Sequence, residues 1–274
     1  MMQRLCTALA LVGSLAVSLA AQTPARSGAT AATGPAGRGG RIVGHIRQTG
    51  PAPGNPLMRM GVDPVCASVN RDGRPVQQFV VKSSDGGLAN VFVALQGTFP
   101  RTPVPSQPVT ITQEKCVYLP RMVAGRVGQT LMIVNRDQTL HNLHSISSKG
   151  NDFNVTQPQF GMVFSYKLKS PDVMMRLTCD VHSWMLGYIG VVDHPYFAVT
   201  GGDGAFTIDN VPAGRQTVRI WHEVFGEMTK TVVVKAGETV TADLVYTGVA
   251  KKAARVQDLI VPSTQTGAMA HAGE

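Results

Sequence analysis

The sequence predicts an all-β fold, built either as one sandwich or as a pair of sandwiches. From Arg41 onward, short apolar runs alternate with turns rich in Gly, Pro, Asn and Asp, which is the pattern of many short strands. No segment shows a sustained helical period. At 274 residues the chain is long enough for one or two domains with their own cores. The main runs are Phe79–Val81, Val91–Leu95, Leu131–Val134, Val173–Leu177 and Ile189–Val192.

The first 20 residues are typical of a secretory signal. Arg4 precedes an apolar run that ends in the small-residue pattern Ser18-Leu-Ala20. That run is too short and wrongly flanked to span a membrane, and no other segment reaches the required length. We therefore expect export to the periplasm or the medium, with no membrane span. Residues 21–39 have the composition of a flexible linker, and residues 250–274 that of a disordered tail.

Composition and charge exclude several functions. The formal net charge is +8, and removing residues 1–20 with their single charged residue, Arg4, leaves +7. A basic balance favours acidic partners or surfaces, but a solvated basic face is the plainer explanation and is favoured over nucleic-acid binding. No basic cluster is interleaved with aromatics, so nucleic-acid binding is not expected. No nucleophile elbow, Ser-His-Asp order or paired-carboxylate site is present, and His222-Glu223 lacks the second His of a metalloprotease helix. We do not expect an enzyme.

Four residues have the types and order of a mononuclear copper site. Cys179, His182 and Met185 share one short loop, and His141 follows the apolar run 131–134. Two imidazoles and a thiolate in a trigonal arrangement, with a weak axial thioether, suit copper in both oxidation states and belong to electron-transfer sites. The sequence therefore predicts one type 1 copper ion held by His141, Cys179, His182 and Met185.

Other uses of these residues compete with copper. His141, His144, Cys179 and His182 could form a closed tetrahedral zinc site, but this leaves Met185 without a role. If the segment is extended, His144 points to the face opposite His141 and is then a surface residue. Met185 could also be ordinary core. A dinuclear copper centre is disfavoured because the loop has one Cys where that centre needs two.

Three cysteines remain once Cys6 is removed with the signal. With Cys179 assigned to metal, Cys66 and Cys116 form an even remainder in an oxidising compartment, where disulfides persist. Asp63-Pro-Val-Cys66 is typical of a turn, and Cys116 begins an apparent strand. A structural disulfide between Cys66 and Cys116 is the expected outcome, and the absence of a Cys-x-x-Cys motif makes a redox-active dithiol the weaker alternative.

The segment from Val109 to Asp193 resembles a cupredoxin of the plastocyanin and amicyanin kind, a Greek-key sandwich. The resemblance lies in five places: Val109-Thr-Ile111, Cys116-Val-Tyr118-Leu-Pro120, the strand ending at Asn135, His141-Asn142 and the short ligand loop. In the second of these, Tyr118 stands where Phe is common. It implies that Asn142 ties the two ligand loops together. It also implies that the ligand at position 182 reaches the surface through an apolar patch, to which Trp184 and Leu186 would contribute.

The segment after Asp193 resembles the carboxypeptidase regulatory-like, transthyretin-like β-sandwich. The resemblance rests on Asp203-Gly-Ala-Phe206 and Val211-Pro-Ala-Gly214. The segment is shorter than a full domain of that family, and we expect the remaining strands upstream, in Gly40–Ile46 and Gly87–Leu95. We therefore expect a cupredoxin at 107–194 inserted into a second small sandwich made of N-terminal strands within 40–106 and a C-terminal part at 195–249.

The function expected from these features is single-electron transfer between redox partner proteins of the cell envelope, some of them acidic. Two alternatives stay open. One is a noncatalytic β-sandwich protein that binds carbohydrate or another envelope component and carries a structural metal. The other is copper storage or delivery.

Overall fold

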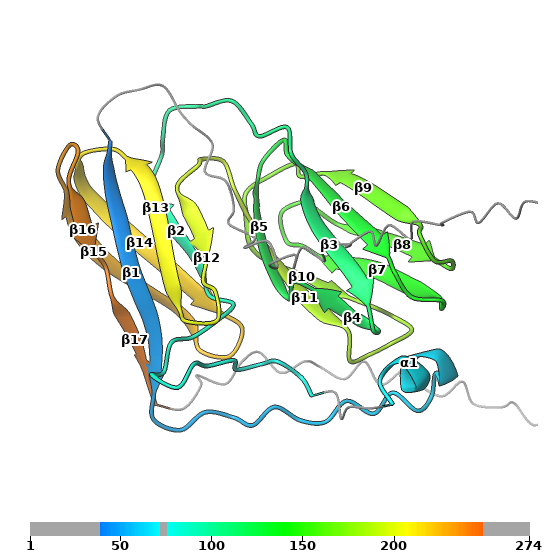
Figure 1. Cartoon of the computed structure of the whole chain (residues 1–274). Coiled ribbons are helices and arrows are strands. Elements are labelled where there is room, and N and C mark those ends of the chain that lie inside the picture. Colours follow the sequence, from blue (N-terminus) through cyan, green and yellow to red (C-terminus); the bar gives the residue numbers. More distant parts are fainter. Residues whose placement is uncertain (1–38, 72–75, 249–274) are drawn as a thin grey trace, which may run out of the picture. The chain divides into compact units, whose positions relative to one another are not determined.

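A computed structural model describes residues 39–71 and 76–248 (Figure 1). The predicted signal at 1–20, all but the last residue of the 21–39 linker and the tail at 250–274 lie outside the described residues. Seventeen strands and one short helix make up the described part, so the all-β prediction is confirmed. Within this part, no helix has both the length and the apolar character needed to cross a membrane.

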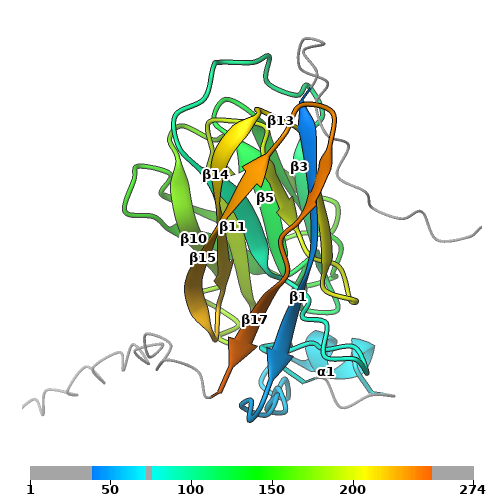
Figure 2. The same cartoon turned by 90° about the vertical axis from the view of Figure 1, so that its left-hand side faces the viewer.

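The outer sandwich takes its strands from both ends of the described chain. One sheet has the order β13-β1-β16, with β17 also paired to β1, and the other has the order β12-β2-β14-β15. In Figure 2, the long strand β1 lies beside β17. The strands are β1 (Gly40–Thr49), β2 (Phe92–Gln96), β12 (Phe197–Val199), β13 (Ala205–Val211), β14 (Gly214–His222), β15 (Gly226–Val234), β16 (Thr239–Thr241) and β17 (Leu244–Thr247).

The inner sandwich consists of the strands between β2 and β12. Its sheets have the orders β5-β11-β10-β7-β8 and β4-β3-β6-β9. The strands are β3 (Val109–Glu114), β4 (Val117–Leu119), β5 (Met122–Arg126), β6 (Thr130–Asn135), β7 (His141–Ile146), β8 (Phe153–Gln157), β9 (Val163–Lys167), β10 (Asp172–Thr178) and β11 (Leu186–Val192). The strand order is therefore nested: the chain leaves the outer sandwich after β2 and returns to it at β12.

Alternating burial explains why these segments form strands. In β1 every second residue is buried, and Ile42 and Ile46 point into the outer core, as expected for a strand with one face on a core. The turn before β13 needs glycine: Gly204 has φ +76°, and a Cβ there would meet the Ile46 carbonyl oxygen at 2.3 Å. The inner core is separate and includes Ile111, Leu131 and other apolar residues.

The two sandwiches meet through an apolar patch and one buried ion pair. Phe92 of β2 packs with Met122 and Val192 of the inner sandwich. Beside this patch, Arg121 donates to both carboxylate oxygens of Glu223, and both side chains are less than 10% exposed. Bidentate pairing satisfies the two charges as they leave water.

Residues 54–71, which we call the cap segment, reach the inner sandwich, where Met60 and Cys66 form a buried cluster with Cys116. Their one helix, α1 (Pro64–Val69), begins at Asp63, whose Oδ1 accepts from the backbone N–H groups of Val65 and Cys66. Cys66 forms the expected disulfide with Cys116, with an S–S distance of 2.05 Å. The predicted turn at Asp63–Cys66 is therefore the first turn of a helix.

One predicted strand is wrong. Residues 79–81 form no strand, although all three are apolar. The backbone N–H and C=O of Val80 both hydrogen-bond with the side chain of Asn55. The guanidinium of Arg121 lies over the Phe79 ring, with its Cζ 5.2 Å from the centre of that ring. Side-chain partners here replace the ladder that a strand would need.

Candidate metal centre

The four predicted ligands come together at one end of the inner sandwich. His141 is the first residue of β7, and Cys179 directly follows the last residue of β10. His182 lies in the loop from β10 to β11, and Met185 directly precedes β11. All four are at most 3% exposed. Because β7 and β10 pair antiparallel, the start of one lies beside the end of the other, which is how two distant segments meet.

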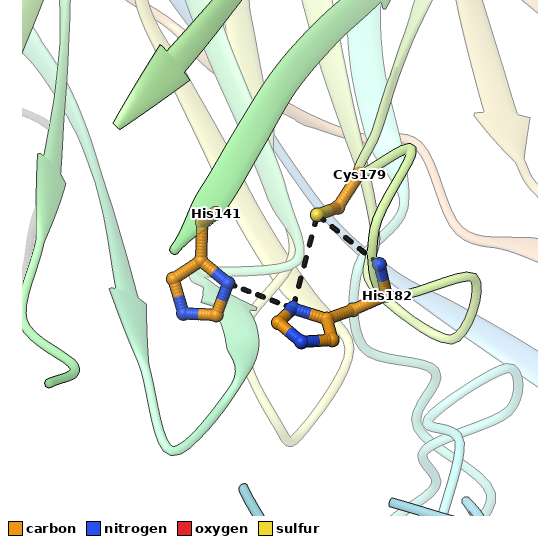
Figure 3. A group of neighbouring side chains, drawn as sticks. All are labelled: His141, Cys179 and His182. Atoms are coloured by element: carbon orange, nitrogen blue, oxygen red, sulfur yellow. Dashed lines mark hydrogen bonds between the residues drawn. The ribbon is translucent and has the colours of Figure 1, made fainter. Parts of the chain in front are cut away.

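The two histidines and the cysteine face one another (Figure 3). His141 Nδ1 lies 3.0 Å from His182 Nδ1, and Cys179 Sγ lies 3.9 Å from the same His182 atom. The three ligand atoms lie within 4.8 Å of one another. For bond lengths of about 2.0 Å to nitrogen and about 2.3 Å to sulfur, a trigonal metal needs separations of about 3.5 Å between nitrogens and about 3.7 Å from nitrogen to sulfur. The distance from Cys179 Sγ to His182 Nδ1 is within about 0.2 Å of that requirement, and the two Nδ1 atoms would have to separate by about 0.5 Å to admit the ion.

The outward nitrogens of both histidines bind carboxylates. His141 Nε2 lies 2.9 Å from Asp137 Oδ2, and His182 Nε2 lies 2.9 Å from Asp63 Oδ2. A carboxylate only accepts hydrogen bonds, so each Nε2 carries the proton, and in a neutral ring Nδ1 then has a lone pair. Two such lone pairs face each other at 3.0 Å, so they need a proton or a metal ion between them. Carboxylates placed behind ligand histidines are typical of metal centres.

The two rings differ in how readily they would hold a proton between them. Burial lowers the pKa of His141, but its hydrogen bonds with Asp137 and Cys179 outweigh burial and raise the pKa overall. Burial, together with the nearby charge of His141, lowers the pKa of His182 against the opposing effect of Asp63. A proton shared by the two Nδ1 atoms would therefore lie on His141, with His182 as the acceptor. A metal ion bound by both Nδ1 atoms would replace this proton.

The surroundings of Cys179 favour its thiolate form. Burial raises the pKa of its thiol, but hydrogen bonds from His141 and from the backbone N–H groups of Asn142 and His182 outweigh burial and lower the pKa overall. The two N–H groups lie 3.3 and 3.4 Å from Sγ. The thiolate is the form that binds metal.

Asn142 and Tyr118 fix the two ligand segments to each other. Asn142 Oδ1 accepts from the Asp180 N–H at 3.3 Å, which joins the His141 strand to the Cys179 loop as the cupredoxin resemblance implies. The Tyr118 hydroxyl lies 2.8 Å from the carbonyl of Asn142 and 2.9 Å from that of Thr178. Burial raises the pKa of Tyr118 well above its usual value, so the hydroxyl stays a donor.

Met185 is placed by its backbone and its core contacts. Its N–H donates to the His182 carbonyl at 2.9 Å, and its side chain belongs to the same buried cluster as Cys179. Axial ligation through its sulfur stays a prediction.

His144 lies apart from this group, as expected. Its side chain is 39% exposed and pairs with Asp180 at 2.9 Å. Because His144 is outside the cluster of ligand atoms, the four-ligand zinc alternative loses its fourth residue.

One expectation about the site is wrong. The resemblance implies that His182 reaches the surface through an apolar patch, but His182 is only 1% exposed. The cap segment covers it: Asp63 binds its Nε2, and Cys66 Sγ lies 3.9 Å from the same nitrogen. Trp184 covers another side of His182, with the centres of the two rings 4.9 Å apart.

Asp63 and Asp137 were not predicted as part of the site. Asp137 precedes His141 by four residues, but that spacing alone carries no metal signal. Asp63 could have been inferred from the disulfide, because pairing Cys66 with Cys116 brings the residues just before Cys66 to the inner sandwich. The two carboxylates also contact the disulfide region directly: Asp137 accepts from the Cys116 N–H at 2.8 Å.

No protein-family model matches this chain, and no curated protein matches it. Among solved structures, a purple cupredoxin from Nitrosopumilus maritimus is 23% identical, with a TM-score of 0.27, and the match covers 30% of this chain and 98% of that one. A cuprous amicyanin variant is 17% identical, with a TM-score of 0.28, covering 36% and 97% of the two chains.

A copper-containing nitrite reductase from Thermus scotoductus SA-01 is 20% identical, with a TM-score of 0.31. The match covers 36% of this chain but only a quarter of the length of that enzyme (25%). These neighbours include cupredoxins, at low TM-score and partial coverage. The chemistry of the centre therefore rests on its own side chains.

Proposed function

We propose that this chain is an exported type 1 copper protein that carries single electrons between redox partners of the cell envelope. The observation that carries the proposal is the pair of Nδ1 atoms, 3.0 Å apart, each fixed by a carboxylate behind it and joined by the Cys179 sulfur. Copper held there would exchange one electron at a time between its cupric and cuprous states.

The protein groups supply the conditions for such a centre. Asp63 and Asp137 hold the two rings, so the ligand positions exist before metal enters. Backbone N–H groups at Cys179 Sγ withdraw charge from the thiolate and tune its donor strength. The burial of all four predicted ligands excludes water. A rigid, dry site changes little between oxidation states, which suits rapid electron exchange.

The first experiment is the visible spectrum of the mature protein after addition of cupric ion and removal of the excess. We expect an intense band near the red end of the spectrum that reductant bleaches. Cys179→Ser should abolish the band, and His144→Ala, which removes a histidine outside the centre, should retain it. A Cys179→Ser protein that stays blue would contradict the ligand assignment.

The same preparation separates the alternatives. A colourless protein that retains zinc would indicate a structural metal in a binding module. A blue protein that quickly loses copper to a chelator would indicate storage or delivery, because the buried centre of an electron carrier should hold its ion.

A further inference from the structure

The edge of His182 that points away from the centre is closed to partners. Asp63 and Cys66 of the cap segment lie against its Nε2, and a disulfide fastens this segment to the inner sandwich. A partner protein that has to touch His182 to exchange electrons with the metal cannot reach it along this edge. Another route must connect the centre to the surface.

Trp184 provides a side route from the same ligand. Its ring lies 4.9 Å from that of His182 at an interplanar angle of 31°. Its Nε1 donates to the Cys116 carbonyl at 2.9 Å, and its own carbonyl accepts from Gln77 at 2.7 Å. Trp184 is half-buried. A fixed aromatic ring therefore leads from a predicted metal ligand toward solvent.

Trp184 lines an open groove of about 530 Å³ between the cap segment and β10. Leu57 and Met58 contribute apolar surface to it, and Leu57 is 55% exposed. Arg59 and Arg176 also line the groove, and no ion pair involves either of them among the described residues. The described residues that line the groove include no Asp or Glu. An apolar floor with unpaired cations favours an acidic partner.

We propose that this groove is the docking surface for an acidic redox protein and that Trp184 is the point where its electron enters or leaves. The inference rests on the proposed electron-transfer function. In each encounter the donor would lose one electron, which a cupric ion held by His141, Cys179 and His182 would accept. No bond forms or breaks, and no proton moves.

The first arm of the test needs no metal. Labelled poly-L-glutamate serves as the acidic polypeptide, and its binding to the metal-free protein is followed by fluorescence anisotropy. The variant Arg59→Glu/Arg176→Glu should bind at least tenfold more weakly at low salt, because two cations of the groove are reversed. Arg215→Glu makes the same kind of change at an exposed residue of β14, outside the groove. It should bind within twofold of the wild type.

The second arm measures electron exchange of the copper-loaded protein. Cuprous protein is oxidised by anionic hexacyanoferrate(III) or by cationic tris(phenanthroline)cobalt(III), each of which accepts one electron. The double reversal should slow the anionic oxidant at least tenfold and leave the cationic one unchanged or faster, and high salt should remove the difference. Poly-L-glutamate should slow oxidation of the wild-type protein and leave oxidation of the double variant unchanged. Trp184→Leu should slow both oxidants at an unchanged visible band.

Each result bears on the inference. Arg215→Glu changes the net charge by half as much as the double reversal, so a loss in Arg215→Glu of half that in the double reversal, on a logarithmic scale, would show a net-charge effect and overturn the inference. An unchanged rate in Trp184→Leu would also overturn it. The double reversal could slow oxidation by hexacyanoferrate(III) although poly-L-glutamate neither binds nor competes. That result would indicate a small anionic donor and overturn the proposal of an acidic protein partner. If the double reversal misfolds, Arg59→Glu alone tests the same point on an exposed side chain. A wild type with no visible band overturns the proposed function, a failure distinct from these.

Discussion

Asp63 Oδ2 lies 2.9 Å from His182 Nε2, although 119 positions separate the two residues. The same carboxylate begins α1 through its other oxygen and accepts from the Thr139 hydroxyl at 2.9 Å. One side chain therefore connects the fold of the cap segment to the orientation of a predicted copper ligand.

Replacing Asp63 should raise the reduction potential. Asp63→Asn keeps the volume and the capping oxygen but puts an amide where the carboxylate accepted from His182, so the ring becomes a weaker donor to cupric ion. A loss of 10 to 100-fold in cupric affinity alone corresponds to a rise of roughly 60 to 120 mV. Voltammetry measures it. Thr139→Val, which leaves the carboxylate on His182, is the control and should shift the potential far less; equal shifts would argue against a direct effect.

Removing the disulfide should open the centre. The bridge closes a loop with a sequence separation of 50, for which the chain-entropy relation gives about 4 kcal/mol of stability. Cys66→Ala/Cys116→Ala should therefore lower the free energy of unfolding in urea and speed copper loss to a chelator. Val69→Ala, which trims an exposed side chain of α1 (43% exposed), should change neither. Unchanged copper loss in the double variant would show that the cap segment stays closed without the bridge.

Met185→Leu should keep the visible band and raise the potential. Leucine preserves the apolar volume but removes the thioether, and losing a donor destabilises the cupric state more than the cuprous state. We expect a rise of at least roughly 60 mV, a tenfold change in the equilibrium. Met175→Leu, the same change at a buried methionine of the same core, is the reference. If both variants have the wild-type potential, Met185 is not an axial ligand.

His222 should make the fold sensitive to acid. Burial, with the charge of Arg121, lowers the pKa of His222 to about 3, whereas an unfolded chain titrates near 6.5. Below pH 6.5 His222 is protonated in the unfolded state but stays neutral in the folded state. The free energy of unfolding therefore falls by about 1.4 kcal/mol per pH unit down to about pH 3. His222→Phe removes this loss. In urea unfolding of metal-free protein, the advantage of the wild type over the variant should shrink as pH falls from 7 to 4.5; a constant difference would contradict the assignment.

Residues 107–194 should fold and bind copper on their own if Cys116 is changed to Ser. The inner sandwich has its own buried cluster and holds all four predicted ligands. Its stability should be lower than that of the whole chain, because the Phe92 contact and the partner of Arg121 are lost. Circular dichroism and the visible band test this prediction. An unfolded fragment would favour one merged unit over an inserted domain.

Local patterns predicted most of the fold and much of the site. Strand alternation and turn residues act over a few positions, so runs such as 131–134 could be read directly. The ligand loop could be read for the same reason, because three ligands share seven residues. The cover over His182 could not, since it depends on a disulfide and a single carboxylate from a segment with little regular structure. Because that histidine is covered, its direct exposure through the expected apolar patch is lost, and we propose Trp184, a residue of that patch, as the remaining route to the surface.

The long first strand has a consequence for how the protein is made. The strands that pair with β1 are β13, β16 and β17, which are synthesised more than 150 residues later; only its last residues also hydrogen-bond with the nearer segment 86–88 within the described part of the chain. Until those arrive, β1 lacks its strand partners on both sides over most of its length, while all strands of the inner sandwich and its four predicted ligands have already been synthesised. Pairings so distant in sequence form slowly. The centre should therefore be able to take up its metal while the surrounding sandwich is still open, and closure of the outer sheets would then be the last step of maturation.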